Sequence, residues 1–447
     1  MSTMRKGLQT AVVLCAMAIL LPCLTLSAQD TKANPSTGTK SNLKVVFSSD
    51  SYSFEALRAL GADSTGGGEA GEVLTALERI HEGDEESWYS SWKAMADILA
   101  KQAAEFAQGG DTVSAQECYF RACEYYRAAE FFIHGTINDL RINETWRLSR
   151  DCFVKGASYT SGLIRPVRIP YEGESLCGYF CKPDATDIQR PLLIVHTGYD
   201  GTAEELYFTT AVAALKRGFD VLVFDGPGQG EAIHEQKLVF RPDWEKVVTP
   251  VVDFALTLPE VDPHRIALFG LSFGGYLAPR AAAYEHRIAA LIADSPIYDW
   301  HATLMSAMPK SFEQGLDDPA ICQKIDASIY AYMKSNIYLR WAINESLYKF
   351  GAKTPSEYLR LTRAYSNRDI AGRIACPTLF VESEADTMVP EDGKAFFDAL
   401  TCPKGSIVFT SEWGAQAHCQ EGNKSISNEQ ILNWLMRTFE MIPSNAH

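Results

Sequence analysis

The segment GLSFG at residues 270–274 lies between two stretches of opposite character. The apolar run IALF at 266–269 precedes it, and the helix-compatible segment GYLA at 275–278 follows it. A G-x-S-x-G between a buried strand and a helix is typical of a tight turn that projects a serine hydroxyl above a sheet, at the positive end of a helix. The alternative is an ordinary strand–helix turn. We interpret the segment as a nucleophile turn, with Ser272 as the nucleophile.

Apolar runs and helical patterns alternate on both sides of this turn. Runs with the length and composition of buried parallel strands occupy residues 191–196, 221–224, 266–269, 289–293, 378–381 and 407–409. Helical stretches lie between most of them, at 204–216, 244–258, 276–284, 393–400 and 429–441. Residues 164–181 contain two alternating segments around Glu172 and Gly173, which predicts an antiparallel hairpin at a sheet edge. The pattern predicts a doubly wound, mostly parallel α/β sheet.

A serine hydroxyl needs a general base, and in this kind of sheet the catalytic order along the chain is serine, acid, histidine. Asp386 follows the strand predicted at 378–381, in a loop at its carboxyl end. Glu382 and Glu384 are the alternatives, but Glu382 falls in the strand alternation and Glu384 falls early in the turn. The acid has to lie beyond the strand to reach the histidine, so we predict Asp386 as the residue that orients the base.

Of the nine histidines, His418 is the one that lies in the loop directly after the final predicted strand. It lies in GAQAHC at 414–419, where small residues allow a loop to fold back over the sheet edge. The competitors His196, His264 and His301 lie on other loops or strand ends and do not fit the required order. His418 is therefore the predicted general base.

The oxyanion of an acyl-transfer reaction needs two N–H donors. One is expected from Phe273, the residue after the nucleophile, and the other from the loop HTGYDG at 196–201. Within that loop we predict the N–H of Tyr199, because the flanking glycines allow close approach of the backbone. An ordinary glycine turn is the alternative interpretation of this loop.

Several other classes of function are excluded by composition and motif. The segment DGPGQG at 225–230 lacks the Gly-Lys-Ser/Thr ending and the spacing of a nucleotide-binding loop. The formal net charge of −15 argues against nucleic acid and against electrostatic docking on anionic membranes. No metal-ligand cluster is evident among the cysteines and histidines. We therefore expect a small-molecule carbonyl substrate and no metal or organic cofactor.

The N-terminus is predicted to be a signal peptide at residues 1–28. A basic pair at 5–6 precedes an apolar run at 11–26 and the small residues at 27–28. Residues 29–46 are polar and are predicted to form a disordered leader. We expect an exported protein, periplasmic or secreted, without stable membrane insertion after cleavage; an uncleaved anchor is the alternative.

Residues 47–160 have helical periodicity and are predicted to form a helical cap domain. A stripe of large apolar residues runs from Trp88 to Phe106, and the glycines at 109–110 predict its end. Ser114 and Glu117 have the spacing of a capping box, which predicts the start of a second helix there.

Residues 161–447 are predicted to form the catalytic domain. The connection at 301–373 is too long for a loop between adjacent strands and has helical, aromatic-rich sequence, so we predict an inserted helical lid. Its aromatic residues either line a substrate pocket or pack in the core, and packing is the more common role. The aromatic residues concerned are Trp300, which directly precedes the insert, and Tyr330, Tyr338, Trp341 and Tyr348 within it.

Several stretches of the chain after Phe47 resemble the α/β hydrolases related to 2,6-dihydropseudooxynicotine hydrolase, a group that includes fungal polyketide-shortening hydrolases. These stretches are VRIPYEG at 167–173, GYDGTAEE at 198–205, DGPGQG at 225–230, GLSFGG at 270–275 and GAQAHCQ at 414–420. In addition, YYRAAEF at 125–131 is similar to the cap helix of that group. The resemblance implies an α/β-hydrolase fold with an N-terminal helical cap.

The resemblance also implies an activity. Its members cleave esters, or C–C bonds beside a carbonyl, without metal or organic cofactor, and the triad transfers onto Ser272, Asp386 and His418. In some members a further cap carboxylate assists C–C cleavage, but no motif here locates it. A peptidase of the prolyl oligopeptidase kind and a non-catalytic binding protein on the same fold are the alternatives. The sequence leaves the oligomeric state open, a homodimer included.

Overall fold

The computed structural model describes residues 43–306, 310–388 and 393–440. The predicted signal peptide, residues 1–28, and residues 29–42 of the predicted leader lie outside this range. Among the described residues, no helix combines the length and the apolar character that a membrane span requires.

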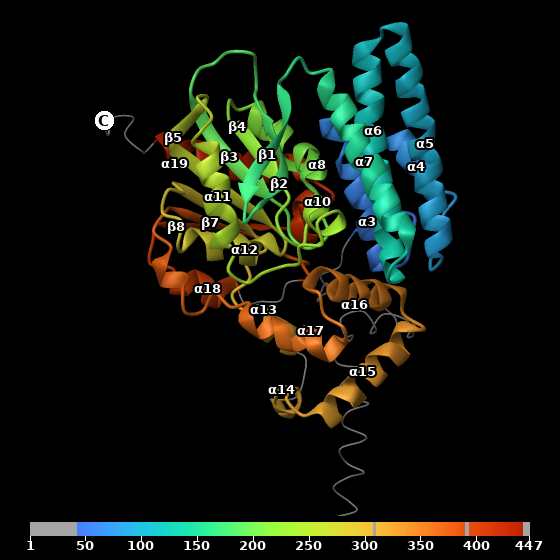
Figure 1. The fold of residues 1–447 in the computed structure, drawn as a ribbon, viewed down its shortest axis with the longest axis vertical. Helices are drawn as coiled ribbons and strands as arrows, with labels where there is room; N and C mark the ends of the chain where they lie inside the picture. Colours follow the sequence, from blue (N-terminus) through green and yellow to red (C-terminus); the bar gives the residue numbers. More distant parts are fainter. Residues whose placement is uncertain (1–42, 307–309, 389–392, 441–447) are drawn as a thin grey trace, which may run out of the picture.

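One sheet of eight strands organises the molecule, in the order β1-β2-β4-β3-β5-β6-β7-β8 (Figure 1). The strands are β1 Ile164–Tyr171, β2 Glu174–Cys181, β3 Arg190–His196, β4 Asp220–Phe224, β5 Val261–Leu271, β6 Ala290–Asp294, β7 Thr378–Ser383 and β8 Lys404–Phe409. Strands β3 to β8 pair in parallel, whereas β1 pairs with β2, and β2 with β4, in antiparallel fashion. The predicted mostly parallel sheet and its edge hairpin are confirmed.

The central strands are buried on both faces, because successive side chains point to opposite sides. On β3, Leu193 and Val195 enter one apolar core, and Leu192 and Ile194 enter the other. The first core includes residues of α8 (Ala203–Leu206), α9 (Val212–Leu215) and α19 (Lys424–Glu440), with a π-helical turn at Tyr207–Ala211 between α8 and α9. The second includes residues of α11 (Glu245–Ala255), α12 (Gly274–Ala282) and α18 (Gly393–Ala399). Short helices complete this part of the chain: α10 Gly230–His234 and the 3-10 turns Ala371–Arg373, Ser411–Trp413 and His418–Gln420.

The N-terminal region is helical and packs on the first face of the sheet, where its side chains continue the same core. Its long helices α5, α6 and α7 stand side by side (Figure 1). The elements are α3 Asp50–Gly61, η1 Asp63–Thr65, α4 Ala70–Leu77, α5 Glu85–Gly109, α6 Thr112–Glu130, η2 Phe131–Gly135 and α7 Leu140–Ser158. We refer to α3–α7 as the helical region.

The predicted capping box at Ser114 and Glu117 is wrong, because the N-cap of α6 lies three residues before Ser114. Gly110 takes a left-handed conformation, with φ of 87°, and the N–H of Asp111 donates back to the carbonyl of Phe106. This tight reversal places Asp111 at the N-cap of α6, so Ser114 lies inside the helix.

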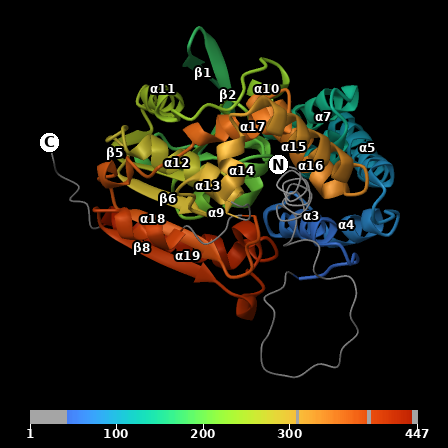
Figure 2. The same ribbon diagram turned by 90° about the horizontal axis from the view of Figure 1, so that it is seen from below.

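The connection between β6 and β7 forms a group of helices, which we call the insert. They are α13 Trp300–Met305, α14 Lys310–Gly315, α15 Pro319–Met333, α16 Ile337–Phe350, α17 Pro355–Leu361 and the 3-10 turn Thr362–Ala364. Seen from below, these helices lie across one end of the sheet and reach the helical region (Figure 2). The contact is direct: the Trp341 ring stacks on Phe131 at 4.4 Å, and Asn344 donates to the carbonyl of Gly135 at 2.7 Å.

Buried charges join the helical region to the loop and helix that follow β3. Arg58 on α3 makes a bidentate contact with Glu205 on α8, at 2.6 and 2.7 Å, and a third contact with Asp200, at 2.6 Å. Arg127 on α6 lies 3.4 Å from the same Glu205 carboxylate. Burial disfavours ionised carboxylates, but the two arginines hold the pKa of Glu205 below its usual value.

Two further carboxylates in this cluster, Glu55 and Glu124, have raised pKa values. Burial raises the pKa of Glu55 to about 7 and that of Glu124 to about 8, against the opposing pull of the arginines. Asp200 and Glu205 form the direct ion pairs with the arginines, whereas burial favours the protonated forms of Glu55 and Glu124. Pairing with arginine and uptake of protons both reduce the cost of burying these ionisable groups.

Replacing Arg58 with Met is expected to lower the free energy of unfolding by about 3–5 kcal/mol, because it leaves buried carboxylates without their cation. Urea unfolding followed by circular dichroism measures the change. Arg147→Met is the control, since Arg147 forms an equally short ion pair with Glu235 at 2.7 Å but is half exposed. Equal unfolding midpoints for the two variants would contradict the expectation.

Candidate active site

Ser272 lies in the turn between β5 and α12 with a left-handed backbone, φ of 59°, which is uncommon for any residue but glycine. The turn is so tight that a Cβ on Gly270 would overlap the carbonyl of Gly274. A Cβ on Gly275 would likewise overlap the carbonyl of Ser295 on the neighbouring connection. The glycines of the motif are therefore sterically required, and the turn holds Ser272 at the carboxyl end of β5.

The structure brings the three predicted catalytic side chains together. The Nε2 atom of His418 lies 2.8 Å from the Oγ of Ser272, and its Nδ1 atom lies 2.7 Å from the Oδ2 of Asp386. Asp386 follows β7, and His418 follows β8 in the turn His418–Gln420. Cys419 and Gln420 both have positive φ, 51° and 58°, so this turn reverses the chain sharply. The reversal carries the imidazole back over the sheet.

The alternative residues are engaged elsewhere. The Glu384 carboxylate accepts the Ser411 N–H at 3.0 Å. His196 is buried, with its Nδ1 3.0 Å from the carbonyl of Thr197, whereas His264 is exposed. His301 pairs with Glu313 in the insert at 2.6 Å. In this arrangement, Asp386 and His418 are the acid and histidine that reach Ser272.

Ser295 belongs to the same group, although the sequence did not indicate it. Its Oγ donates to Asp386 Oδ2 at 2.9 Å and lies 3.2 Å from Nδ1 of His418. It follows β6 and has a φ of 63°. A single serine after a strand belongs to no recognisable motif. Its place beside Asp386 becomes clear only because β6 pairs with β7, which brings the ends of the two strands together.

The predicted oxyanion donors also lie next to Ser272. A Cβ on Gly198 would overlap the N atom of Phe273 and would come within 2.7 Å of the Cβ of Ser272, so the loop after β3 lies directly against the turn. Within the described parts of the chain, the backbone N–H groups of Tyr199 and Phe273 have no hydrogen-bond acceptor. Two unpaired donors beside a serine are available to bind a negatively charged oxygen.

Comparison with known proteins finds relatives whose sequences align with most of this chain. A family model described as "Esterase FrsA-like" matches residues 78–313, more than half of the chain. The hydrolase LUC6 from Fusarium sp is 35% identical over 88% of this chain and 98% of its own length. The 20-hydroxy-prefusarin hydrolase FUS2 from Gibberella moniliformis is 34% identical, again over 88% of this chain and 98% of its own length.

The chain belongs to the FrsA-like esterase family. The crystal structure of 2,6-dihydroxy-pseudo-oxynicotine hydrolase has a similar fold, with a TM-score of 0.66 and 22% identity over 85% of this chain and 95% of that one. The predicted α/β-hydrolase fold, the hydrolase activity and the resemblance to these hydrolases are confirmed.

The surroundings of His418 in this FrsA-like esterase stabilise the imidazolium that forms when the ring takes up a proton. Burial opposes the imidazolium, but the Asp386 carboxylate outweighs it and raises the pKa of His418 well above the usual value. The ring of Phe54, from α3 of the helical region, lies 6.4 Å from the imidazole between centroids. The helical region thus contributes to the walls of the site.

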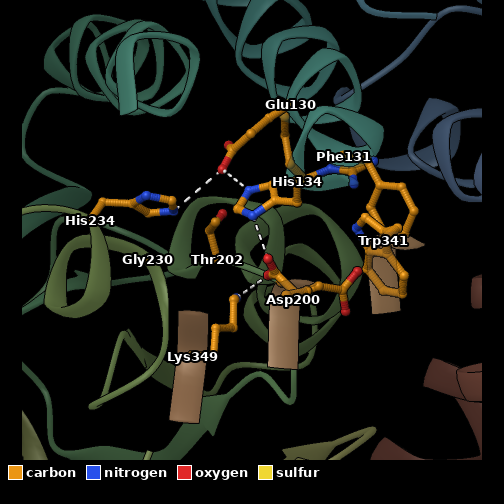
Figure 3. Close-up of a pocket in the computed structure, with 12 residues that line it drawn as sticks. Glu130, Phe131, His134, Asp200, Thr202, Gly230, His234, Trp341 and Lys349 are labelled. Atoms are coloured by element: carbon orange, nitrogen blue, oxygen red, sulfur yellow. Dashed lines mark hydrogen bonds and ion pairs between the residues drawn. The ribbon is translucent and has the colours of Figure 1, made fainter. Parts of the chain in front are cut away.

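A small cavity of about 20 Å³ lies where the helical region, the loop after β3 and the insert meet (Figure 3). A chain of polar contacts crosses it: His234 to Glu130 at 3.3 Å, Glu130 to His134 at 2.9 Å, and His134 to Glu345. Burial opposes the charge on His134, but Glu345 and Glu130 raise its pKa to about 9. The cavity has room for about one water molecule, and Ser272 is not among the residues that line it.

This polar chain ends at the loop after β3, residues 197–201, which we call the oxyanion loop after its predicted role. Glu345 pairs with Lys349 at 3.1 Å, and the Nζ of Lys349 donates to the carbonyl of Tyr199 at 2.6 Å. His134 and Lys349 hold the pKa of Glu345 at about 2 even though burial opposes ionisation. Lys349 therefore fixes the backbone of Tyr199 from α16 of the insert.

The aromatic residues in and before the insert, which were expected either to line a pocket or to pack in the core, differ in their surroundings. Trp341 lines the small cavity, and the ring of Trp300 packs against Phe273 at 5.3 Å. Tyr338 stacks on Trp341, whereas Tyr330 is 38% exposed. Of the five aromatic residues, Trp341 is buried, Tyr330 is exposed and the other three are partly buried, with Trp300 beside the turn at Ser272. Among the described residues, no group of three His, Cys, Asp or Glu side chains could hold a metal ion.

Replacing Asp386 with Asn is expected to lower the pKa of His418, because it removes the charge that stabilises the imidazolium. A ¹H–¹⁵N NMR titration of the imidazole measures the shift. The control is Glu384→Gln, which removes a charge two residues away that contacts Ser411. An unchanged His418 pKa in Asp386→Asn would show that the carboxylate does not govern the histidine.

Proposed function

We propose that this hydrolase works by acyl transfer through Ser272, His418 and Asp386. The observation that carries the proposal is the continuous chain of short contacts from Ser272 Oγ through the imidazole to Asp386 Oδ2. A hydroxyl in this position can lose its proton to Nε2 as it attacks.

The steps follow from the positions of these groups. Ser272 Oγ attacks a carbonyl carbon, its proton passes to Nε2 of His418, and Asp386 stabilises the resulting imidazolium. The N–H groups of Tyr199 and Phe273 stabilise the oxyanion. An alcohol, or a carbanion stabilised by a neighbouring carbonyl, leaves with the proton from His418. Water, activated by the same histidine, then releases the acid and restores Ser272.

The substrate class is a small carbonyl compound, an ester or a ketone with a cleavable C–C bond. The relative FUS2 is named for a 20-hydroxy-prefusarin substrate, and the family is named for esterases. The rings of Phe54 and Trp300 beside His418 and Phe273 favour a hydrophobic or aromatic substrate.

Ser272→Ala is expected to lower turnover of p-nitrophenyl esters by about 10³–10⁶-fold while leaving the fold intact, because only the nucleophile is lost. Steady-state kinetics measures turnover, and a fluorophosphonate probe followed by mass spectrometry identifies the labelled serine. Ser328→Ala, on the exposed side of α15, is the matched control. Labelling at a serine other than Ser272 would refute the assignment.

Ester and C–C cleavage are separated by assaying p-nitrophenyl esters and β-diketones side by side. Turnover of esters alone would remove C–C cleavage from the proposal, and turnover of diketones alone would remove ester cleavage. Cleavage of short aminoacyl amides without either would favour the peptidase alternative.

We also propose that the protein is exported. The support is the basic pair at 5–6, the apolar run at 11–26 and the small residues at 27–28. Expression with the native N-terminus in a secreting host is expected to give a mature chain that starts near residue 29, measured by intact mass. Leu20→Arg, which interrupts the apolar run, is expected to block processing. A full-length mass for the unaltered protein would contradict cleavage.

A further inference from the structure

The segment DGPGQG at 225–230, which does not fit a nucleotide site, forms a compact turn after β4. A Cβ on Gly226 would come within 2.6 Å of the Trp244 ring, and one on Gly230 would overlap the Asp225 carboxylate. Gly228 has a φ of 86°. The glycines are thus explained by packing and backbone geometry, but the fully buried Gln229 between them is not.

Every polar atom of the Gln229 side chain is used. Its Oε1 accepts the N–H of Gly226 at 3.0 Å. Its Nε2 donates to two successive carbonyls of the loop after β3, Thr197 at 2.7 Å and Gly198 at 3.0 Å. The orientation of the amide is unambiguous, because a carbonyl accepts and a backbone N–H donates.

The carbonyl of Gly198 and the N–H of Tyr199 belong to one peptide unit. In a planar trans peptide these two groups point in opposite directions, so a donor that holds the carbonyl also sets the direction of the N–H. We infer that Gln229 is a positioning residue, which holds the Gly198 carbonyl and thereby aims the Tyr199 N–H at the oxyanion. The inference rests on the proposed acyl-transfer function.

The next peptide unit is held in the same way from another part of the chain. Lys349 donates to the carbonyl of Tyr199 at 2.6 Å, so three successive carbonyls, from Thr197 to Tyr199, each accept a side-chain hydrogen bond. A loop without regular secondary structure is kept in one conformation by these contacts. Preorganised donors of this kind stabilise an oxyanion without reorganisation during the reaction.

Two variants of Gln229 test the inference. Gln229→Met removes all three hydrogen bonds, whereas Gln229→Glu keeps the volume and the acceptor for Gly226 but loses the donor. For both we expect kcat with p-nitrophenyl butyrate to fall by about 10²-fold and KM to change by less than about 3-fold, since the lost interaction forms in the transition state. The affinity for an aliphatic trifluoromethyl ketone, whose adduct carries an oxyanion, is expected to fall by a similar factor.

Asp225→Asn is the matched control in the same turn. Asp225 accepts the N–H groups of Ala203 and Glu231, at 2.8 and 3.2 Å, and does not contact the oxyanion loop. We expect this variant to lower the melting temperature but to retain kcat within about 3-fold, because the oxyanion donors are undisturbed.

The outcomes separate this inference from the proposed function. A native enzyme that cleaves neither p-nitrophenyl esters nor β-diketones and does not bind the ketone would refute acyl transfer itself. If the native enzyme is active, two results would overturn the inference. The first is a folded Gln229 variant that keeps the native kcat and ketone affinity. The second is a folded variant that loses activity only through a higher KM. If Gln229→Met does not fold, Gln229→Glu decides between these outcomes.

Discussion

The close approach of backbone segments at the carboxyl end of β5 is the constraint on which the active site depends. The turn at Ser272 leaves no room for a side chain at Gly270 or Gly275, and the neighbouring loop leaves none at Gly198. Because these segments touch through backbone atoms, their N–H groups come close to the serine hydroxyl. A methyl group at any of these glycines would push the segments apart and separate the donors from the nucleophile.

Parts of the chain remote in sequence hold this arrangement in place. Gln229 and Lys349 bind the carbonyls of the loop after β3, and Arg58 binds the next residue, Asp200. These side chains come from the turn after β4, from the insert and from the helical region. Since each is buried and charged or fully hydrogen-bonded, displacing it is costly, and the loop is correspondingly rigid. The helical region and the insert are thus structural parts of the active site, in addition to covering it.

Much of this site could be predicted because its residues obey local rules. The glycines around Ser272 mark a strand–helix turn, and Asp386 and His418 follow strands in the order that the chemistry requires. Ser295, Gln229 and Lys349 could not be found in this way, because each acts on a partner far along the chain and none belongs to a motif for that contact. The start of α6 was misplaced for a related reason: the left-handed turn at Gly110 overrode the local capping pattern.

The sequence by itself determined the alternation of strands and helices, the tight turn at Ser272 and the chain order of Ser272, Asp386 and His418, since periodicity and steric demand at glycine act over a few residues. Only the tertiary structure decided which charges are paired, which carboxylates have raised pKa values and which side chains hold the loop after β3. Those properties depend on burial and on distances between distant segments, and both arise only when the helical region, the sheet and the insert pack together.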